Sequence, residues 1–232
     1  MISICVPTYN RYEMTVQCFE QVLHDDRIDE IVVVDDYSED GSYELLKERF
    51  KYDSKVKIFR NKINLDCFLN KRMSIDLASN DWCILFDSDN VLDSFYLDLI
   101  FDYPWHDGMI FQPSTAYPHF NFEAYSGLVI NKNNVANYID KPMFETMLNA
   151  QNFFVNRSSY LETWNNMEQV NPVTSDSIWF NYNWLKDGKE IFVVPNLCYY
   201  HRVHEGSHYK NNIHKTPNGF HEQILQSLRE LK

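Results

Sequence analysis

Residues 83–89 read Cys83-Ile84-Leu85-Phe86-Asp87-Ser88-Asp89, an apolar run followed at once by two carboxylates one residue apart. The apolar run predicts a buried strand, so both acids lie at its carboxyl end. In an open α/β sheet, ligands bind at the carboxyl ends of the strands. Acids at alternate positions point to the same side, and such oxygen ligands suit a hard cation that bridges a diphosphate. This stretch therefore predicts a metal–nucleotide site.

A second apolar run, residues 31–34, is followed by Asp35 and Asp36. Aspartate after a strand is also common simply because it favours turns, and for either pair alone this structural interpretation is equally good. Two strand ends that both carry acids favour one shared cleft.

The order of expected elements points to the fold class. The first half alternates expected strands (2–6, 31–34, 56–59 and 82–86) with expected helices (12–23, 41–50, 69–78 and 94–100). This βαβ order predicts a mainly parallel sheet with right-handed crossovers. The second half is less regular, with strands expected at 109–111, 127–130, 191–194 and 198–200 and helices at 143–148, 175–186 and 220–231.

We therefore expect an α/β fold with a single domain over residues 1–219. Its mainly parallel, Rossmann-like nucleotide-binding half spans residues 1–100, and its mixed acceptor half spans residues 101–219. A C-terminal amphipathic helix follows at residues 220–232, with its apolar residues on one stripe.

Composition excludes several classes of protein. A hydrophobic fraction of 44% and an aromatic fraction of 16% are too high for a disordered chain. The formal net charge of −12 argues against nucleic-acid partners and against a polybasic membrane anchor. No apolar stretch is long enough to span a bilayer, which leaves peripheral membrane association open.

The sequence also predicts a cytoplasmic location. Its five cysteines are dispersed and form no CxxC pair, which is typical of reduced core thiols. The chain starts directly in a predicted strand, so we expect no signal peptide before the fold.

A dinucleotide site and a P-loop are both disfavoured. The turn after the first strand, Pro7-Thr8-Tyr9-Asn10-Arg11, contains no glycine. Only six glycines occur in the whole chain, and none of them makes a phosphate-cradling loop.

Four segments in this order resemble family 2 inverting glycosyltransferases with the GT-A fold. They are Val6 to Arg11, Ile31 to Ser42, Asn64 to Ala78, and Phe86 to Asn90 with its DXD pattern. Any one of them is a weak signal, whereas the ordered set over the first hundred residues is strong. The resemblance implies a metal-dependent, inverting transfer of a sugar from a nucleotide sugar, most simply a UDP-sugar, to a glycan or lipid-linked acceptor.

The resemblance also assigns the donor site. Tyr9 is similar to the aromatic residue that stacks on uracil, with the backbone around Pro7 beside the base. Asp36 resembles the carboxylate that accepts the uracil N3–H, while Asp35 holds the loop. Arg11 and Ser88 are further donor contacts, although a solvated arginine is an equally good interpretation of Arg11.

The resemblance implies a divalent metal, Mn²⁺ or Mg²⁺. Asp87 resembles the ribose or metal contact and Asp89 the main metal ligand. His204 fits the family's Arg-x-His pattern and is the third ligand candidate, with His201 and Arg202 as secondary candidates in a His-rich loop that also holds His208 and Lys210. A histidine ligand favours Mn²⁺.

Asp176, in Ser175-Asp176-Ser177 at an expected helix start, matches the position of the family's Glu-Asp or Asp-Asp motif. We expect it to be the catalytic base, although it is also placed to be a helix cap. Trp179 and Asn183 share its helical face and are acceptor candidates, although core packing is an equally good interpretation of Trp179. The aromatic residues Tyr125, Phe153 and Trp164 are candidates for an acceptor platform.

The third segment departs from the family pattern. Asp66, Lys71 and Arg72 stand where the family often has Gly, Arg and Asn. We expect Lys71 to replace a lost cation beside the diphosphate.

Three alternatives remain beside an active transferase. A nucleotidyltransferase usually shows a Gly-rich, basic opening loop, which is absent here. A catalytically silent sugar-nucleotide-binding module is disfavoured by the intact acids. A subunit of a larger glycan-synthesis assembly would use residues 220–231 as a docking helix.

Overall fold

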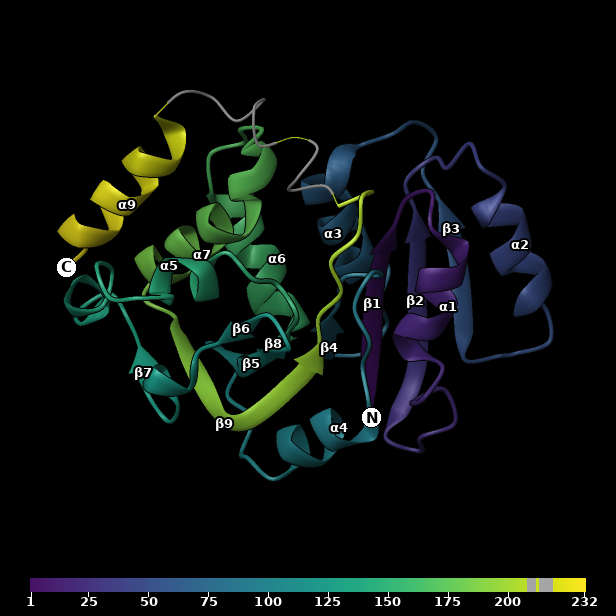
Figure 1. Ribbon diagram of the computed structural model, residues 1–232, viewed down its shortest axis with the longest axis horizontal. Helices are drawn as coiled ribbons and strands as arrows, with labels where there is room; N and C mark the ends of the chain where they lie inside the picture. Colours follow the sequence, from purple (N-terminus) through teal and green to yellow (C-terminus); the bar gives the residue numbers. More distant parts are fainter. Residues whose placement is uncertain (208–211, 213–218) are drawn as a thin grey trace.

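The computed structural model describes residues 1–207, 212 and 219–232. Its strands form one mixed sheet in the order β3-β2-β1-β4-β8-β5-β9-β7, with β6 paired to β5 (Figure 1). The chain has the α/β fold that the sequence predicts. None of the described helices has the length and apolar character that a bilayer crossing demands.

The first part of the chain builds the parallel half of the sheet. Its strands are β1 (Ile2–Thr8), β2 (Ile28–Asp35), β3 (Val56–Arg60) and β4 (Trp82–Leu85), and its helices are α1 (Tyr12–Phe19), α2 (Ser42–Arg49), α3 (Asp66–Asp76) and α4 (Ser94–Phe101). β1 is buried along its whole length, and β2 is buried except at Asp29. Parallel strands covered on both faces read as continuous apolar runs, which is why these elements were predictable.

The second part builds the antiparallel and mixed half. Its strands are β5 (Met109–Tyr117), β6 (Phe120–Asn121), β7 (Val129–Ile130), β8 (Phe153–Asn156) and β9 (Glu190–Tyr200). Its helices are α5 (Phe144–Leu148), α6 (Arg157–Asn166), α7 (Asp176–Lys186) and α9 (Phe220–Glu230), with 3₁₀ turns at η1 (Glu123–Tyr125), η2 (Val135–Asn137) and η3 (Val173–Ser175). β8 runs antiparallel to both β4 and β5, and so joins the two halves.

Two strands expected near the C-terminus are one strand in the structure. β9 runs without interruption from Glu190 to Tyr200 beside β5, with a register shift between Pro113 and Thr115. Asn196 has a positive φ of 61° within it. The apparent gap in the apolar pattern is therefore an irregularity within one strand.

The helices α3, α6 and α7 pack in succession beside the sheet, and α9 packs on α7. Figure 1 shows α9 at the far end of the molecule from α2, which lies beside β3. This arrangement brings the start of α7 to face the carboxyl ends of the parallel strands.

Candidate active site

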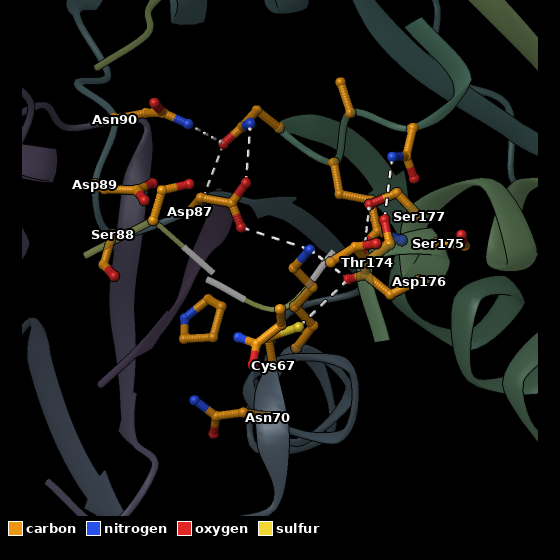
Figure 2. A pocket seen from close by; sticks show the side chains of 18 of the residues that line it. Cys67, Asn70, Asp87, Ser88, Asp89, Asn90, Thr174, Ser175, Asp176 and Ser177 are labelled. Carbon is orange, nitrogen blue, oxygen red and sulfur yellow. Dashed lines mark hydrogen bonds and ion pairs between the residues drawn. The ribbon is translucent and has the colours of Figure 1, made fainter. Parts of the chain in front are cut away.

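A cleft of about 1170 Å³ lies where the two halves meet. One wall comes from the carboxyl ends of β1, β2 and β4, which contribute Pro7, Asp36 and the loop from Asp87 to Asn90. The other wall includes the start of α7. Figure 2 shows Asp87, Ser88 and Asp89 on one side, Asp176 on the other, and Cys67 and Asn70 of α3 between them.

Asp89 lies between the guanidinium of Arg11 and the imidazole of His204. Arg11 Nη1 donates to Asp89 Oδ2 at 2.8 Å, and His204 Nε2 lies 3.0 Å from the same oxygen. Burial raises the pKa of Asp89, but the hydrogen bond with His204 and the Arg11 charge outweigh it and lower the pKa to about 2. Asp89 is therefore ionised at neutral pH, and the structure brings together three of the residues predicted from sequence.

Arg202 holds the loop that carries Asp89. Its guanidinium donates to the backbone carbonyls of Asp89, Asn90 and Met14, and to Gln17 Oε1. The start of the loop after β9 is thus fastened to the loop after β4 and to α1.

Lys71 connects the two walls of the cleft. Its Nζ lies 2.7 Å from Asp176 Oδ2 and 3.7 Å from Asp87 Oδ1. Burial lowers the pKa of Lys71, but the charges of Asp176 and Asp87 raise it well above its ordinary value, so the ammonium stays charged. Lys71, which the sequence predicts to lie beside the diphosphate, thus contacts Asp176 directly in this structure.

Asp87 has a different environment from Asp89. Burial and the charges of Asp89 and Asp176 raise the pKa of Asp87 to about 6, against the opposing effect of Lys71. Asn152, from the segment before β8, accepts from Asp87 N at 2.8 Å and donates to Asp87 Oδ2 at 3.2 Å. Sequence reasoning missed Asn152, because no local pattern marks a contact across 65 residues.

The carboxylate after β2 is held by groups from the segment between β3 and α3. Asp36 Oδ1 accepts from Asn61 Nδ2 and from Leu65 N, both at 2.8 Å. Burial raises the pKa of Asp36 despite these two hydrogen bonds. Tyr9 is 39% exposed and lines the same cleft, so its ring is accessible to a ligand. Asp35 accepts from Ser38 N at 3.0 Å and so holds the loop, as expected.

Comparison with known proteins identifies the half of the chain that builds the strand-end wall. Residues 3–103, which contain β1 to β4 and the Asp87-Ser88-Asp89 loop, match the family model described as Glycosyl transferase family 2. Residues 3–103 are thus similar to glycosyl transferase family 2. The family resemblance predicted from four short segments is therefore confirmed.

Two curated relatives each align with less than half of the chain. Abequosyltransferase RfbV of Salmonella typhimurium is 33% identical over 96 residues, which are 40% of this chain and 29% of the relative. Glycosyltransferase GlyG of Streptococcus pneumoniae serotype 4 is 28% identical over 102 residues, which are 44% of this chain and 34% of the relative. The aligned part thus spans about a third of each relative.

Solved structures extend the likeness over both halves of the chain. S. aureus TarS residues 1–349, crystallised in complex with UDP-GlcNAc, superpose with a TM-score of 0.67 and 15% identity over 90% of this chain and 60% of that one. The same protein crystallised in complex with UDP gives a TM-score of 0.65 over 98% of this chain and 70% of that one. At this identity the likeness shows the fold, which is that of the GT-A glycosyltransferase structures.

The residues of this cleft fit a divalent metal bound through two protein ligands. Within residues 1–207, 212 and 219–232, no group of three His, Cys, Asp or Glu side chains is arranged to hold a metal. Asp89 and His204 nevertheless meet at 3.0 Å, as an ionised carboxylate and an imidazole. A cation held by one or two protein groups and by phosphate oxygens fits this pair.

Trp179 and Asn183 do not line the cleft, whereas the secondary candidates His201 and Arg202 do. Trp179 packs against Tyr182 and Phe220, and Asn183 donates to the Trp179 carbonyl. His201 lines the cleft and pairs with His119 at 3.0 Å between the Nδ1 atoms. Burial and the His119 charge lower the pKa of His201.

The expected aromatic acceptor platform is wrong. Phe153, Trp164 and Tyr125 are 0%, 3% and 4% exposed, and all three belong to the hydrophobic core. Phe153 lies in β8 and Trp164 in α6, two elements that sequence reasoning did not identify. The other candidates in the late loop, His208 and Lys210, lie outside the described residues.

Proposed function

We propose that this protein is a metal-dependent, inverting glycosyltransferase that moves a sugar from a nucleotide sugar, with a UDP-sugar as first choice, to a glycan or lipid-linked acceptor. The observation that carries the proposal is the convergence of Asp87 and Asp89 with Asp176 on one cleft, from opposite halves of the chain. The fold of a TarS structure that contains UDP-GlcNAc supports the choice of donor.

Asp176 is the general base in this proposal. Its Oδ2 is engaged by Lys71 at 2.7 Å, and among the described residues the printed contact of Oδ1 is with Ser177 Oγ at 3.5 Å. Oδ1 takes the proton of the acceptor hydroxyl, and the hydroxyl oxygen attacks the anomeric carbon while the bond to the UDP oxygen breaks. A single displacement of this kind inverts the configuration at the anomeric carbon.

The donor site then holds the leaving nucleotide. In this proposal the uracil ring of the donor lies between Tyr9 and Asp36. The positive charges of Arg11 and Lys71 lie beside the diphosphate. Asp89 and His204, with Asp87 nearby, would hold Mn²⁺ or Mg²⁺. When bound, this cation neutralises charge that develops on the departing phosphates.

The cysteines support a reducing, cytoplasmic setting for the reaction. All five of them are free, and Cys5, Cys18 and Cys83 are buried. Thiols that are left unpaired and buried are typical of compartments that keep cysteine reduced.

A panel of nucleotide sugars tests the proposal. Hydrolysis of one donor should depend on Mn²⁺ or Mg²⁺ and stop with EDTA. Asp176→Asn should lower kcat for transfer by about 10²–10⁴-fold, because the amide cannot accept the proton. Asp102→Asn, at the exposed end of α4, is the matched control and should behave as wild type.

The stereochemical outcome is a separate test. NMR of the first-formed product should show an anomeric configuration opposite to that of the donor. Retention of configuration, or near-normal transfer by Asp176→Asn, would contradict the proposed mechanism.

A further inference from the structure

Ser175, His221 and Glu145 form a chain of hydrogen bonds on the acceptor side of the cleft. Ser175 Oγ lies 2.9 Å from His221 Nδ1, and His221 Nε2 lies 2.7 Å from Glu145 Oε1. The three residues come from η3, α9 and α5, which are far apart in sequence. All three line the cleft, and Ser175 directly precedes Asp176.

The partners of its two nitrogens orient the His221 ring. An ionised carboxylate can only accept, so the His221 ring carries its proton on Nε2 and donates it to Glu145. The Ser175 hydroxyl can either donate to Nδ1 or accept from it, so it pairs with the ring in either case. His221 is thereby oriented at both ring nitrogens.

Exposure separates the roles of the three residues. Ser175 is 1% exposed, so its hydroxyl is an anchor for His221 and not a nucleophile open to substrate. The side chains of His221 and Glu145 are 28% and 50% exposed. One oxygen of Glu145 engages His221, and the half-exposed carboxylate has a second oxygen to offer a ligand.

Helix α9, which carries His221, also contacts the rest of the protein at other points. Phe220 packs on Trp179 of α7, with ring centroids 5.6 Å apart. Arg229, near the far end of α9, pairs with Asp140 at 2.8 Å. These contacts position α9 independently of His221, so a change at His221 can be separated from loss of the helix.

We propose that Glu145 and His221 form an acceptor subsite that selects a polyhydroxylated acceptor, meaning a sugar or a polyol. One hydroxyl of such a molecule faces Asp176, and a second hydroxyl donates to the Glu145 carboxylate. His221 is a positioning residue, because it holds that carboxylate in place through Ser175. The carboxylate of this subsite, Glu145, comes from α5. The residue directly before Asp176 is Ser175, which offers a hydroxyl.

This subsite rests on the proposed function, because it needs a donor sugar to transfer. The experiment compares methyl glycosides and glycerol with propan-1-ol as acceptors, each with the donor found in the nucleotide-sugar panel. Propan-1-ol offers one hydroxyl and cannot also contact Glu145. The readouts are the acceptor KM and the ratio of transfer to donor hydrolysis.

Wild type should favour the glycosides or glycerol over propan-1-ol. His221→Ala and Glu145→Gln should lower the ratio of transfer to hydrolysis by about tenfold or more for polyhydroxylated acceptors, mainly through a higher acceptor KM. Neither variant should change the ratio for propan-1-ol. His221→Gln, which can donate and accept through its amide, should recover part of the loss.

Arg229→Ala is the control, since it removes a surface contact of the same helix and should leave the ratio unchanged. An equal fall in Arg229→Ala and His221→Ala would overturn the subsite, because the effect would then come from helix docking. A ratio unaffected by His221→Ala and Glu145→Gln would also overturn it. Failure of wild type to hydrolyse any nucleotide sugar would instead overturn the proposed function and the subsite with it.

Discussion

Replacing Lys71 with methionine should destabilise the protein strongly. The side chains of Lys71 and Asp176 are each only 9% exposed, and Lys71 Nζ is also 3.7 Å from Asp87. Methionine keeps much of the length but removes the charge, which leaves a buried carboxylate without its cation. Breaking a buried ion pair in this way costs about 3–5 kcal/mol.

A chain of this size loses roughly 2–4 °C of Tm per kcal/mol, so Tm should fall by about 6–20 °C. Urea unfolding and thermal melts measure the change. Lys51→Met is the matched control, because Lys51 pairs with Glu48 on the surface and both side chains are well exposed. The control should change stability by less than about 1 kcal/mol.

The double variant Lys71→Met/Asp176→Asn separates pairing from packing. A neutral amide needs no cation, so the double variant should recover at least about 1 kcal/mol of the loss in Lys71→Met. If Lys71→Met behaves like Lys51→Met, or if the second substitution recovers nothing, Lys71 and Asp176 do not form a desolvated pair.

Three further outcomes follow from the donor side of the cleft. Asp89→Ala should bind UDP with Mn²⁺ no better than wild type binds it in EDTA, as titration calorimetry would show; unchanged metal dependence would move the metal site elsewhere. Asp36→Ala should weaken the binding of UDP more than the binding of free Mn²⁺. Equal affinity of the wild type for UDP and ADP would contradict a uracil pocket. The pKa of Asp87 is raised from 3.8 to about 6 in the folded protein, so folding favours the neutral carboxyl. This contribution to stability is fully present below pH 3.8 and is lost as the pH rises through 6. Asp87→Asn should therefore gain stability over wild type between pH 4.5 and 7 in urea unfolding, and a pH-independent difference would count against the raised pKa.

The parallel half could be predicted because its strands carry their own signal. β1 and β2 are continuous apolar runs, and the acids after β2 and β4 mark the carboxyl edge of the sheet. The mixed half could not be predicted as well. β8 has only four residues and pairs with β4, some 70 positions earlier, while the irregular backbone at Asn196 divides the pattern of β9.

The candidate site shows the same division. Sequence identified the charged groups at the strand ends, and the structure places Arg11, Asp89 and His204 in contact. It could not show that Lys71 faces Asp176, because the two are 105 positions apart. Sequence likewise misassigned Phe153, since an aromatic side chain looks the same in a core as in a binding site until its neighbours are known.

The pairing of β4 with β8 has a consequence for engineering. The family match ends at residue 103, but β8 begins only at Phe153. A fragment cut at 103 would expose the edge of β4, with its fully buried Cys83, Ile84 and Leu85, to other chains. An uncovered apolar edge strand promotes aggregation. Chimaeras that exchange acceptor halves between transferases should therefore leave β8 with the donor half and place the crossover after it.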